Sequence, residues 1–183
     1  MVHVALLRGV NVGGANKIAM RELKTVFEAA GLELVRTYIN SGNVIFSTEV
    51  EDRTRLVREL GGAIEKRFGF AVRMLVLNGA EMRSVVGALP EHWANDDARK
   101  CDVLFLWGEV DSPSILEQLE WDPDLEDVRY TPGAVIRCVA RKDASRSRIT
   151  RIVGTSLYRQ ITIRNCNTAR RLLQLMEEAG AQP

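Results

Sequence analysis

Aromatic residues and histidines are scarce in this sequence. Phe, Trp and Tyr make up 6% of its 183 residues, so it lacks the ladder of aromatic side chains on which RNA-binding sheets stack bases. Of the two histidines, His92 has Asp96 and Asp97 nearby, but a solvated loop explains this group better than a metal site does. We therefore predict no metal site and no cofactor.

Long apolar runs are missing too. No stretch approaches the roughly 20 apolar residues that span a bilayer, and residues 1–20 do not have the pattern of a signal peptide. The three cysteines, Cys101, Cys138 and Cys166, are an odd number at wide spacing, which indicates buried free thiols in a reducing compartment. We expect a cytoplasmic protein that does not contact membranes.

The charges are balanced overall but unevenly distributed. The net charge is +1, which by itself suggests no polyanionic partner. Residues 109–128 hold eight acids and no Lys or Arg, whereas residues 129–171 hold eleven Lys or Arg and one acid, Asp143. Four basic residues fit a phosphate-contact surface for nucleic acid: Arg141, Lys142, Arg146 and Arg148. We favour the alternative that the basic stretch neutralises the acidic one within the molecule or across a homodimer.

Hydrophobic periodicity predicts the order β-α-β-β-α-β twice. The first series has strands at 4–7, 35–39, 44–48 and 71–77 and helices at 16–30 and 52–68, with Asn16 and Asp52 at the helix starts. A helix at 80–89 follows. The second series has strands at 101–107, 128–131, 134–140 and 161–164 and helices at 113–119, 148–158 and 167–179. We predict an α/β (α+β) protein of two tandem ferredoxin-like halves, residues 1–78 and 101–183, linked by residues 79–100.

The loop after the first strand is the main candidate for a binding site. A glycine-rich turn leads from Arg8 to a helix start near Lys17, and free backbone N–H groups at such a start favour an anion. The loop has neither the Walker A spacing nor the G-x-G-x-x-G spacing. In the competing interpretation the glycines only turn the chain and Arg8 pairs with an acid.

A second strand, R-x-x-N and helix sequence begins at Arg164. If the two strand ends face each other, a cleft between the halves would be lined by Arg8, Asn11, Gly13, Gly14, Lys17, Arg164, Asn165, Asn167 and Thr168. Paired arginines in a cleft suit an oxyanion. We therefore expect a phosphorylated or anionic ligand: a nucleotide, a phosphometabolite or a nucleic acid.

Two other classes of function stay open. A small transferase acting on a phosphorylated metabolite would need an acid or base that the sequence does not reveal, so enzymatic activity and catalytic residues are unassigned. A ligand-free interaction or oligomerisation module would use the acidic and basic segments. Cys166 has no histidine evidently placed as its base, so we interpret it as an inert thiol.

Three motifs in register resemble a widespread bacterial family known only as a domain of unknown function. They are ALLRGVNVGGANKIAMREL near the start, VRTYINSGNVIF in the hairpin and YRQITIRNCNTARRL near the end. The resemblance covers nearly the whole chain and implies a duplicated ferredoxin-like fold, with no activity or site residue to carry over. Cys166 stands where relatives usually have tryptophan, so a role that needs an aromatic ring is not expected there.

Overall fold

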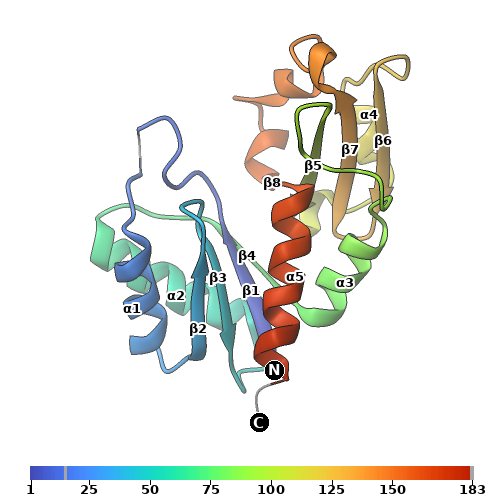
Figure 1. The fold of residues 1–183 in the computed structure, drawn as a ribbon. Coiled ribbons are helices and arrows are strands. Elements are labelled where there is room, and N and C mark those ends of the chain that lie inside the picture. The colour runs from blue at the N-terminus through green and yellow to red at the C-terminus, as the bar shows by residue number, and fades with distance from the viewer. Residues whose placement is uncertain (15, 182–183) are drawn as a thin grey trace. The chain divides into compact units, whose positions relative to one another are not determined.

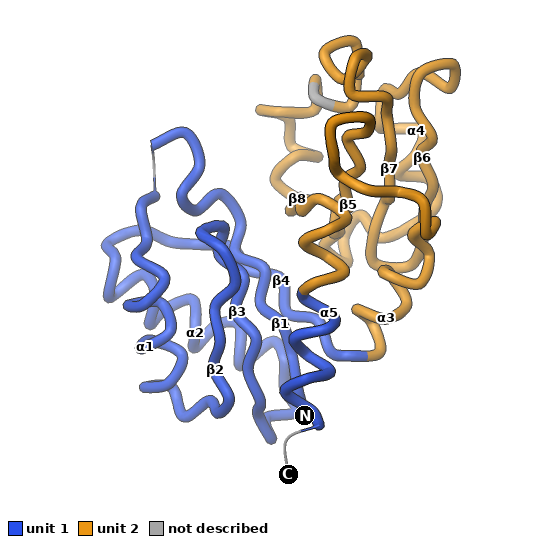
Figure 2. Tube along the Cα trace, in the orientation of Figure 1, with its two compact units in different colours: residues 1–79, 172–183 blue, residues 80–171 orange. Residues whose placement is uncertain are grey.

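The structure of the protein is a computed structural model that describes residues 1–14 and 16–181. The chain forms two compact units (Figure 2): unit 1 comprises Met1–Gly79 and Leu172–Pro183, and unit 2 comprises Ala80–Arg171. Each unit contains a four-stranded antiparallel sheet accompanied by helices. The protein therefore has an α+β fold consistent with two tandem halves. Among the described residues, no helix has the length and apolar character that crossing a membrane requires.

The described residues of unit 1 form four strands, two complete helices and part of a third (Figure 1). They are β1 (Val2–Leu7), α1 (Met20–Ala29), β2 (Glu33–Tyr38), β3 (Asn43–Ser47), α2 (Arg53–Phe68), β4 (Met74–Asn78) and the C-terminal part of α5 (Cys166–Gly180). The strand order is β2-β3-β1-β4. The central strand β1 pairs on both sides, so that Ala5 lies opposite Val44 of β3 and Val76 of β4.

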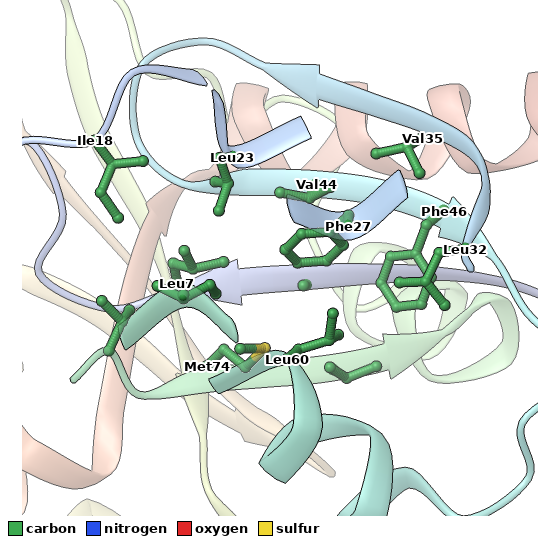
Figure 3. Packing of buried hydrophobic residues seen from close by; sticks show 14 of the residues in the cluster. Leu7, Ile18, Leu23, Phe27, Leu32, Val35, Val44, Phe46, Leu60 and Met74 are labelled. Carbon is green, nitrogen blue, oxygen red and sulfur yellow. The ribbon is translucent and has the colours of Figure 1, made fainter. Parts of the chain in front are cut away.

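The two complete helices pack their apolar residues on one face of this sheet (Figure 3). Leu23 of α1 and Leu60 of α2 are fully buried. The ring of Phe27 on α1 meets the ring of Phe46 on β3 edge-on, with 5.5 Å between centroids. Apolar residues recur about every 3.6 positions in the helices and every 2 in the strands, so these side chains all face the same core. Their removal from water stabilises the unit.

The predicted ends of α2 are confirmed. Asp52 caps its first turn by accepting a hydrogen bond from the backbone N–H of Arg55 at 2.9 Å. Gly69 ends the helix with a left-handed backbone, at φ 80°, a conformation that glycine adopts without the steric cost of a Cβ atom.

The predicted start of α1 is wrong. The helix begins at Met20 rather than at Asn16, and Ala19 is the residue before its first turn. Asn16 has a positive φ of 50° and its side chain donates to the carbonyl oxygen of Gly9 at 3.2 Å. The side chain that was expected to cap the helix instead closes the preceding loop, because asparagine tolerates the left-handed conformation.

Unit 2 repeats the strand order with different helices. Its elements are α3 (Gly79–Gly87, from Ala80), β5 (Arg99–Leu106), η1 (Gly108–Val110), α4 (Ile115–Gln118), β6 (Glu126–Thr131), β7 (Ala134–Ala140), η2 (Arg141–Asp143), η3 (Ile149–Ile152), η4 (Leu157–Gln160), β8 (Ile161–Asn165) and the start of α5. The order β6-β7-β5-β8 is the order of unit 1 shifted by four strands.

Backbone hydrogen bonds at the ends of the central strands repeat as well. Leu7 N–H donates to Gly42 in unit 1 at 2.8 Å, and Leu106 N–H donates to Gly133 in unit 2 at 2.9 Å. The next residues, Arg8 and Trp107, donate to the segments before β4 and β8, respectively. The structural counterpart of Arg8 is thus Trp107.

The helix predicted over residues 148–158 is wrong. Two short 3-10 segments, η3 and η4, occupy this part of the chain, and Gly154 between them has a φ of 92°. The Thr155 hydroxyl donates to the carbonyl oxygen of Ile152 at 2.6 Å and accepts from the N–H of Tyr158 at 3.2 Å. A left-handed glycine and a threonine that bonds to the backbone favour turns over a helix. The helix predicted over 113–119 is present only as the short α4.

The interpretation of all three cysteines as free thiols is wrong for two of them. Cys101 on β5 and Cys138 on β7 lie directly opposite each other, with 4.1 Å between their Cα atoms, and form a disulfide. Cys166 is free and buried, and burial raises the pKa of its thiol. The sequence spacing of 37 residues does not reveal the pair, because only the strand register makes the two residues neighbours.

A buried ion network lies on the unit 2 sheet. Arg137 on β7 is 2% exposed, and its Nη1 donates to Glu126 Oε2 at 3.1 Å and to Ser147 Oγ at 2.7 Å. Its Nε lies 3.3 Å from Asp102 Oδ2 but has no hydrogen-bond partner of good geometry among the described residues. A buried guanidinium needs such partners because losing its hydration is costly.

Gly42 is the glycine whose replacement should cost the most in unit 1. A Cβ atom there would lie 2.5 Å from Val10 Cγ2 and 2.7 Å from Leu7 Cβ, on a backbone with φ +68°. We expect Gly42→Ala to lower the free energy of unfolding by about 3 kcal/mol, from overpacking and backbone strain together. Gly31→Ala is the matched control, because Gly31 has φ +80° with open space around it, and should cost only about 1 kcal/mol. Equal losses in denaturant titrations would contradict this account.

The disulfide predicts a thiol count. Protein unfolded without reductant in the presence of an alkylating agent should show one alkylated cysteine, Cys166, and two more thiols after reduction. Mass spectrometry of the intact chain measures both numbers. Three alkylated cysteines before reduction would restore the free-thiol interpretation.

Candidate functional site

The first two sequence motifs meet at one place in unit 1. The opening loop leaves β1 after Leu7, and the turn between β2 and β3 carries Gly42. The Leu7 N–H donates to the Gly42 carbonyl oxygen at 2.8 Å, and the Asn11 amide donates to Asn40 Oδ1 at 3.0 Å. The hairpin turn therefore packs beside the opening loop. This contact follows from the pairing of β1 with β3.

Asn11 holds the loop together. Its Nδ2 donates to the carbonyl oxygen of Ile18 at 2.9 Å, and its Oδ1 accepts from the N–H of Ile18 at 2.9 Å. Its backbone N–H donates to the carbonyl oxygen of Asn16 at 3.1 Å. One side chain thus bridges the start of the loop, the segment before α1 and the hairpin turn.

Unusual backbone conformations concentrate here. Of the four non-glycine residues with positive φ in the described chain, three belong to this loop and hairpin: Asn11 at 55°, Asn16 at 50° and Ile39 at 47°. A β-branched residue such as Ile39 rarely adopts this conformation. Such strain persists only where surrounding contacts enforce it, and it is concentrated at functional sites.

The loop and the turn border an open hollow of about 370 Å³. It is lined by Asn11, Gly14, Lys17, Ile18, Ala19 and Asn40. Lys17 supplies a positive charge. No side-chain hydrogen bond caps the start of α1 within the described residues, so the positive end of this ten-residue helix has no side-chain acceptor. Both features favour a negatively charged group.

Two of the predicted unit 1 residues do not line this hollow. Arg8 is half-buried, its backbone N–H donates to Arg73 at 2.8 Å, and it makes further contacts within the protein. Gly13 lies in the turn and has a positive φ of 61°. Three of the five predicted residues, Asn11, Gly14 and Lys17, are therefore brought together, while Ile18, Ala19 and Asn40 were not predicted. The sequence shows Asn40 in a polar turn between two strands. The formation of a turn is by itself enough to account for a polar residue there, so the sequence does not point to a role in binding.

The predicted unit 2 residues make internal contacts around the end of β8. Arg164 is 8% exposed and donates to the Thr162 hydroxyl at 3.1 Å and to the Ile163 carbonyl oxygen at 2.8 Å. Loss of hydration lowers the pKa of its guanidinium to about 10. Asn165 Oδ1 accepts from the N–H of Thr168 at 2.8 Å, which satisfies a donor in the first turn of α5.

Asn167 fixes the loop before β5. Its Oδ1 accepts from Asn95 N–H at 3.1 Å, and its Nδ2 donates to the Asn95 carbonyl oxygen at 3.0 Å. Arg170 donates to the carbonyl oxygens of Trp93 and Pro90 in the same loop. The RNCNT motif thus anchors a neighbouring loop of unit 2.

The two R-x-x-N segments are not structural repeats. Arg8 follows the central strand β1, whereas Arg164 lies within the edge strand β8. The two residues also belong to different units. A shared cleft lined by Arg8 and Arg164 stays a prediction.

Of the four residues predicted to contact nucleic acid, two bind groups within the protein and two are exposed. Arg141 donates to the carbonyl oxygens of Asp96 and Arg99 and so holds a loop, and Arg146 pairs with Asp143 at 3.0 Å. Lys142 and Arg148 are exposed. Within the described residues, ion pairs between the acidic segment 109–128 and the basic stretch include Asp127 with Arg129, Glu126 with Arg137 and Glu120 with Arg151. These pairs support charge neutralisation within the molecule.

Replacing Asn11 by glycine tests its bridging role. Asn11→Gly keeps the left-handed backbone accessible but removes the side-chain hydrogen bonds to Ile18 and Asn40. We expect a loss of about 2 kcal/mol in the free energy of unfolding and faster hydrogen exchange of the Ile18 amide. Asn16→Gly, which removes one bond of 3.2 Å, is the control and should cost less than about 1 kcal/mol. An unchanged exchange rate at Ile18 would count against the bridge.

Comparison with known proteins places the chain among uncharacterised bacterial proteins. It is similar in structure to the conserved bacterial protein SP0830 from Streptococcus pneumoniae, with a TM-score of 0.79, 28% sequence identity and coverage of 96% of this chain and 98% of that one. The comparison with curated proteins found no match. The family model described as protein of unknown function (DUF1697) matches residues 1–136, which include the opening loop and the hairpin. The chain therefore belongs to the DUF1697 family.

Proposed function

We propose that the hollow in unit 1 binds a small phosphorylated or otherwise anionic molecule. The observation that carries the proposal is the convergence of Lys17 and the uncapped start of α1 on one hollow. Backbone N–H groups and the helix dipole favour negative charge at such a start, and the ammonium group of Lys17 adds a mobile positive charge.

The neighbouring amides give the site its shape. Asn11 and Asn40 line the hollow, and Asn11 uses both N–H donors of its amide on Ile18 and Asn40. Asn40 takes part in this bond through Oδ1, which leaves the two N–H donors of its own amide outside the bond. Donors that are already positioned lose little freedom when a ligand arrives. The bound group would therefore carry several acceptor oxygens, as a phosphate does, with its remaining part reaching out of the hollow.

We also infer that the protein is a duplication of the ferredoxin-like β-α-β-β-α-β unit, with halves at residues 1–78 and 101–183 joined by residues 79–100. The shared strand order and the matching bonds at Leu7 and Leu106 support this inference. In the second half, short 3-10 segments stand where the first has α2. The anion site is a property of the first half alone, because Lys17 and the start of α1, on which it depends, belong to unit 1.

A thermal-shift assay tests the proposed ligand class. Inorganic phosphate, a sugar phosphate and a nucleoside diphosphate are added to the wild-type protein, and at least one should raise its melting temperature. A ligand at 100 times its Kd stabilises the folded state by about 2.7 kcal/mol. Lys17→Ala should weaken the binding of that ligand by about tenfold, because it removes the charge nearest the bound group.

Lys24→Ala is the matched control. Lys24 lies on α1 and pairs with Glu28 at 3.5 Å, so this variant changes the net charge equally without touching the hollow. A stabilisation that survives Lys17→Ala, or one that Lys24→Ala abolishes equally, would contradict the proposed site.

A further inference from the structure

The three cysteines of the chain lie in one row across the unit 2 sheet. Cys138 of β7 lies directly opposite Cys101 of β5 and forms the disulfide with it. On the other side of β5, the register with β8 pairs Asp102 with Asn165. The next position along this register places Cys166, where the chain passes from β8 into α5, beside Cys101. Cys101 is therefore the middle residue of the row, with a cysteine on each side.

The loop before β5 contacts this row. The carbonyl oxygen of Trp93 in that loop accepts from the Cys166 thiol, with 3.6 Å between sulfur and oxygen. Trp93 also borders an open hollow of about 410 Å³ together with Cys138. Side chains alternate along β7, so that of Cys138 lies on the face opposite to Arg137, and its direct neighbour on β6, Asp127, lines the same hollow. Both outer cysteines are thus on the Trp93 side of the sheet.

The outer cysteines differ in their access to solvent. Cys166 and Cys101 are 0% exposed, whereas Cys138 is 7% exposed and lines the hollow. A reagent that enters from solution therefore meets Cys138 first. The buried thiol of Cys166 is shielded from such a reagent but lies next to the disulfide.

The spacing of the row permits a disulfide on either side of Cys101. Directly opposite residues of antiparallel strands have Cα atoms about 4.5–5.5 Å apart, within the range of roughly 4.4–6.8 Å that disulfides span. Cys138 and Cys166 are separated by two strand spacings, about 9.5 Å, which exceeds that range. Cys101 can therefore bond to either neighbour, but the two outer cysteines cannot bond to each other.

We propose that the three cysteines form a thiol–disulfide exchange site that delivers a reactive thiol at Cys138. The thiolate of Cys166, after losing its proton to solvent, attacks Cys101 Sγ and forms a new S–S bond. The bond between Cys101 and Cys138 breaks, and its electron pair leaves on Cys138 Sγ, which takes up a proton from water in the hollow. The numbers of disulfides and thiols do not change, so the step needs no oxidant or reductant.

The exchange transfers the free thiol from a buried position to an open one. In the resting structure the thiol belongs to Cys166. After the exchange it belongs to Cys138 at the hollow, where a small disulfide from solution can form a mixed disulfide with it and release its own thiol. The whole row belongs to unit 2, so the exchange site is independent of the anion site in unit 1.

Alkylation of the folded protein tests the exchange. Wild-type protein is incubated without reductant in iodoacetamide and digested without reduction, and its peptides are mapped by mass spectrometry. We expect an alkyl group on Cys138 together with a Cys101–Cys166 linkage, because alkylation traps the released thiol. Cys166→Ala should lose the alkylation of Cys138, since no thiol is left to attack the disulfide. The melting temperature of this variant checks that it is folded.

Two further variants test the geometry without the exchange step. Cys138→Ala keeps Cys101 and Cys166; after reduction, diamide should oxidise this pair to a disulfide in most molecules, taking up their two electrons and two protons. Cys101→Ala is the matched control, because its two remaining cysteines are too far apart and should stay thiols. Circular dichroism of each reduced variant confirms its fold before diamide is added, and intact mass measures the loss of two hydrogens.

Four outcomes would overturn the proposal. In the folded wild-type protein they are the absence of alkylation and alkylation of Cys166 with the Cys101–Cys138 disulfide intact. In the variants they are unchanged alkylation of Cys138 in Cys166→Ala and oxidation of Cys138→Ala no more complete than that of Cys101→Ala.

Discussion

The close approach of the hairpin turn to the opening loop controls the geometry of unit 1. Gly42 leaves no room for a side chain beside Leu7 and Val10, and its carbonyl oxygen accepts from Leu7 at the end of β1. This contact brings Asn40 within hydrogen-bond reach of Asn11. Two segments about 30 residues apart along the chain thereby become the walls of a single hollow.

The two units share a strand order and differ in what covers the sheet. In unit 1 the helices α1 and α2 bury a continuous apolar core. In unit 2 shorter elements bury a smaller cluster, and the same sheet carries the buried Arg137 network. The hollow at the loop before α1 in unit 1 and the hollow beside Trp93 and Cys138 in unit 2 lie at different places and have different linings.

Sequence periodicity predicted the strands and the long helices well, because burial of apolar side chains decides both. It failed where polar side chains bond to the backbone. Asn16 is of a residue type that often caps helices, but its side chain bonds to the carbonyl oxygen of Gly9 and closes a loop instead. Thr155 and Gly154 interrupt a stretch whose apolar spacing is helical. The R-x-x-N pattern at Arg164 looked like a repeat of Arg8, but the strand order gives the two arginines different positions.

The sequence by itself determined the two α+β halves, the glycine-rich loop with Lys17 and the family, since local pattern and composition carry that information. Only the tertiary structure decided which residues meet across strands: Asn11 with Asn40, Cys101 with Cys138, and Arg137 with Glu126 and Asp102. Strand register and turn conformation set these contacts. Both depend on packing between residues far apart along the chain, which no local pattern encodes.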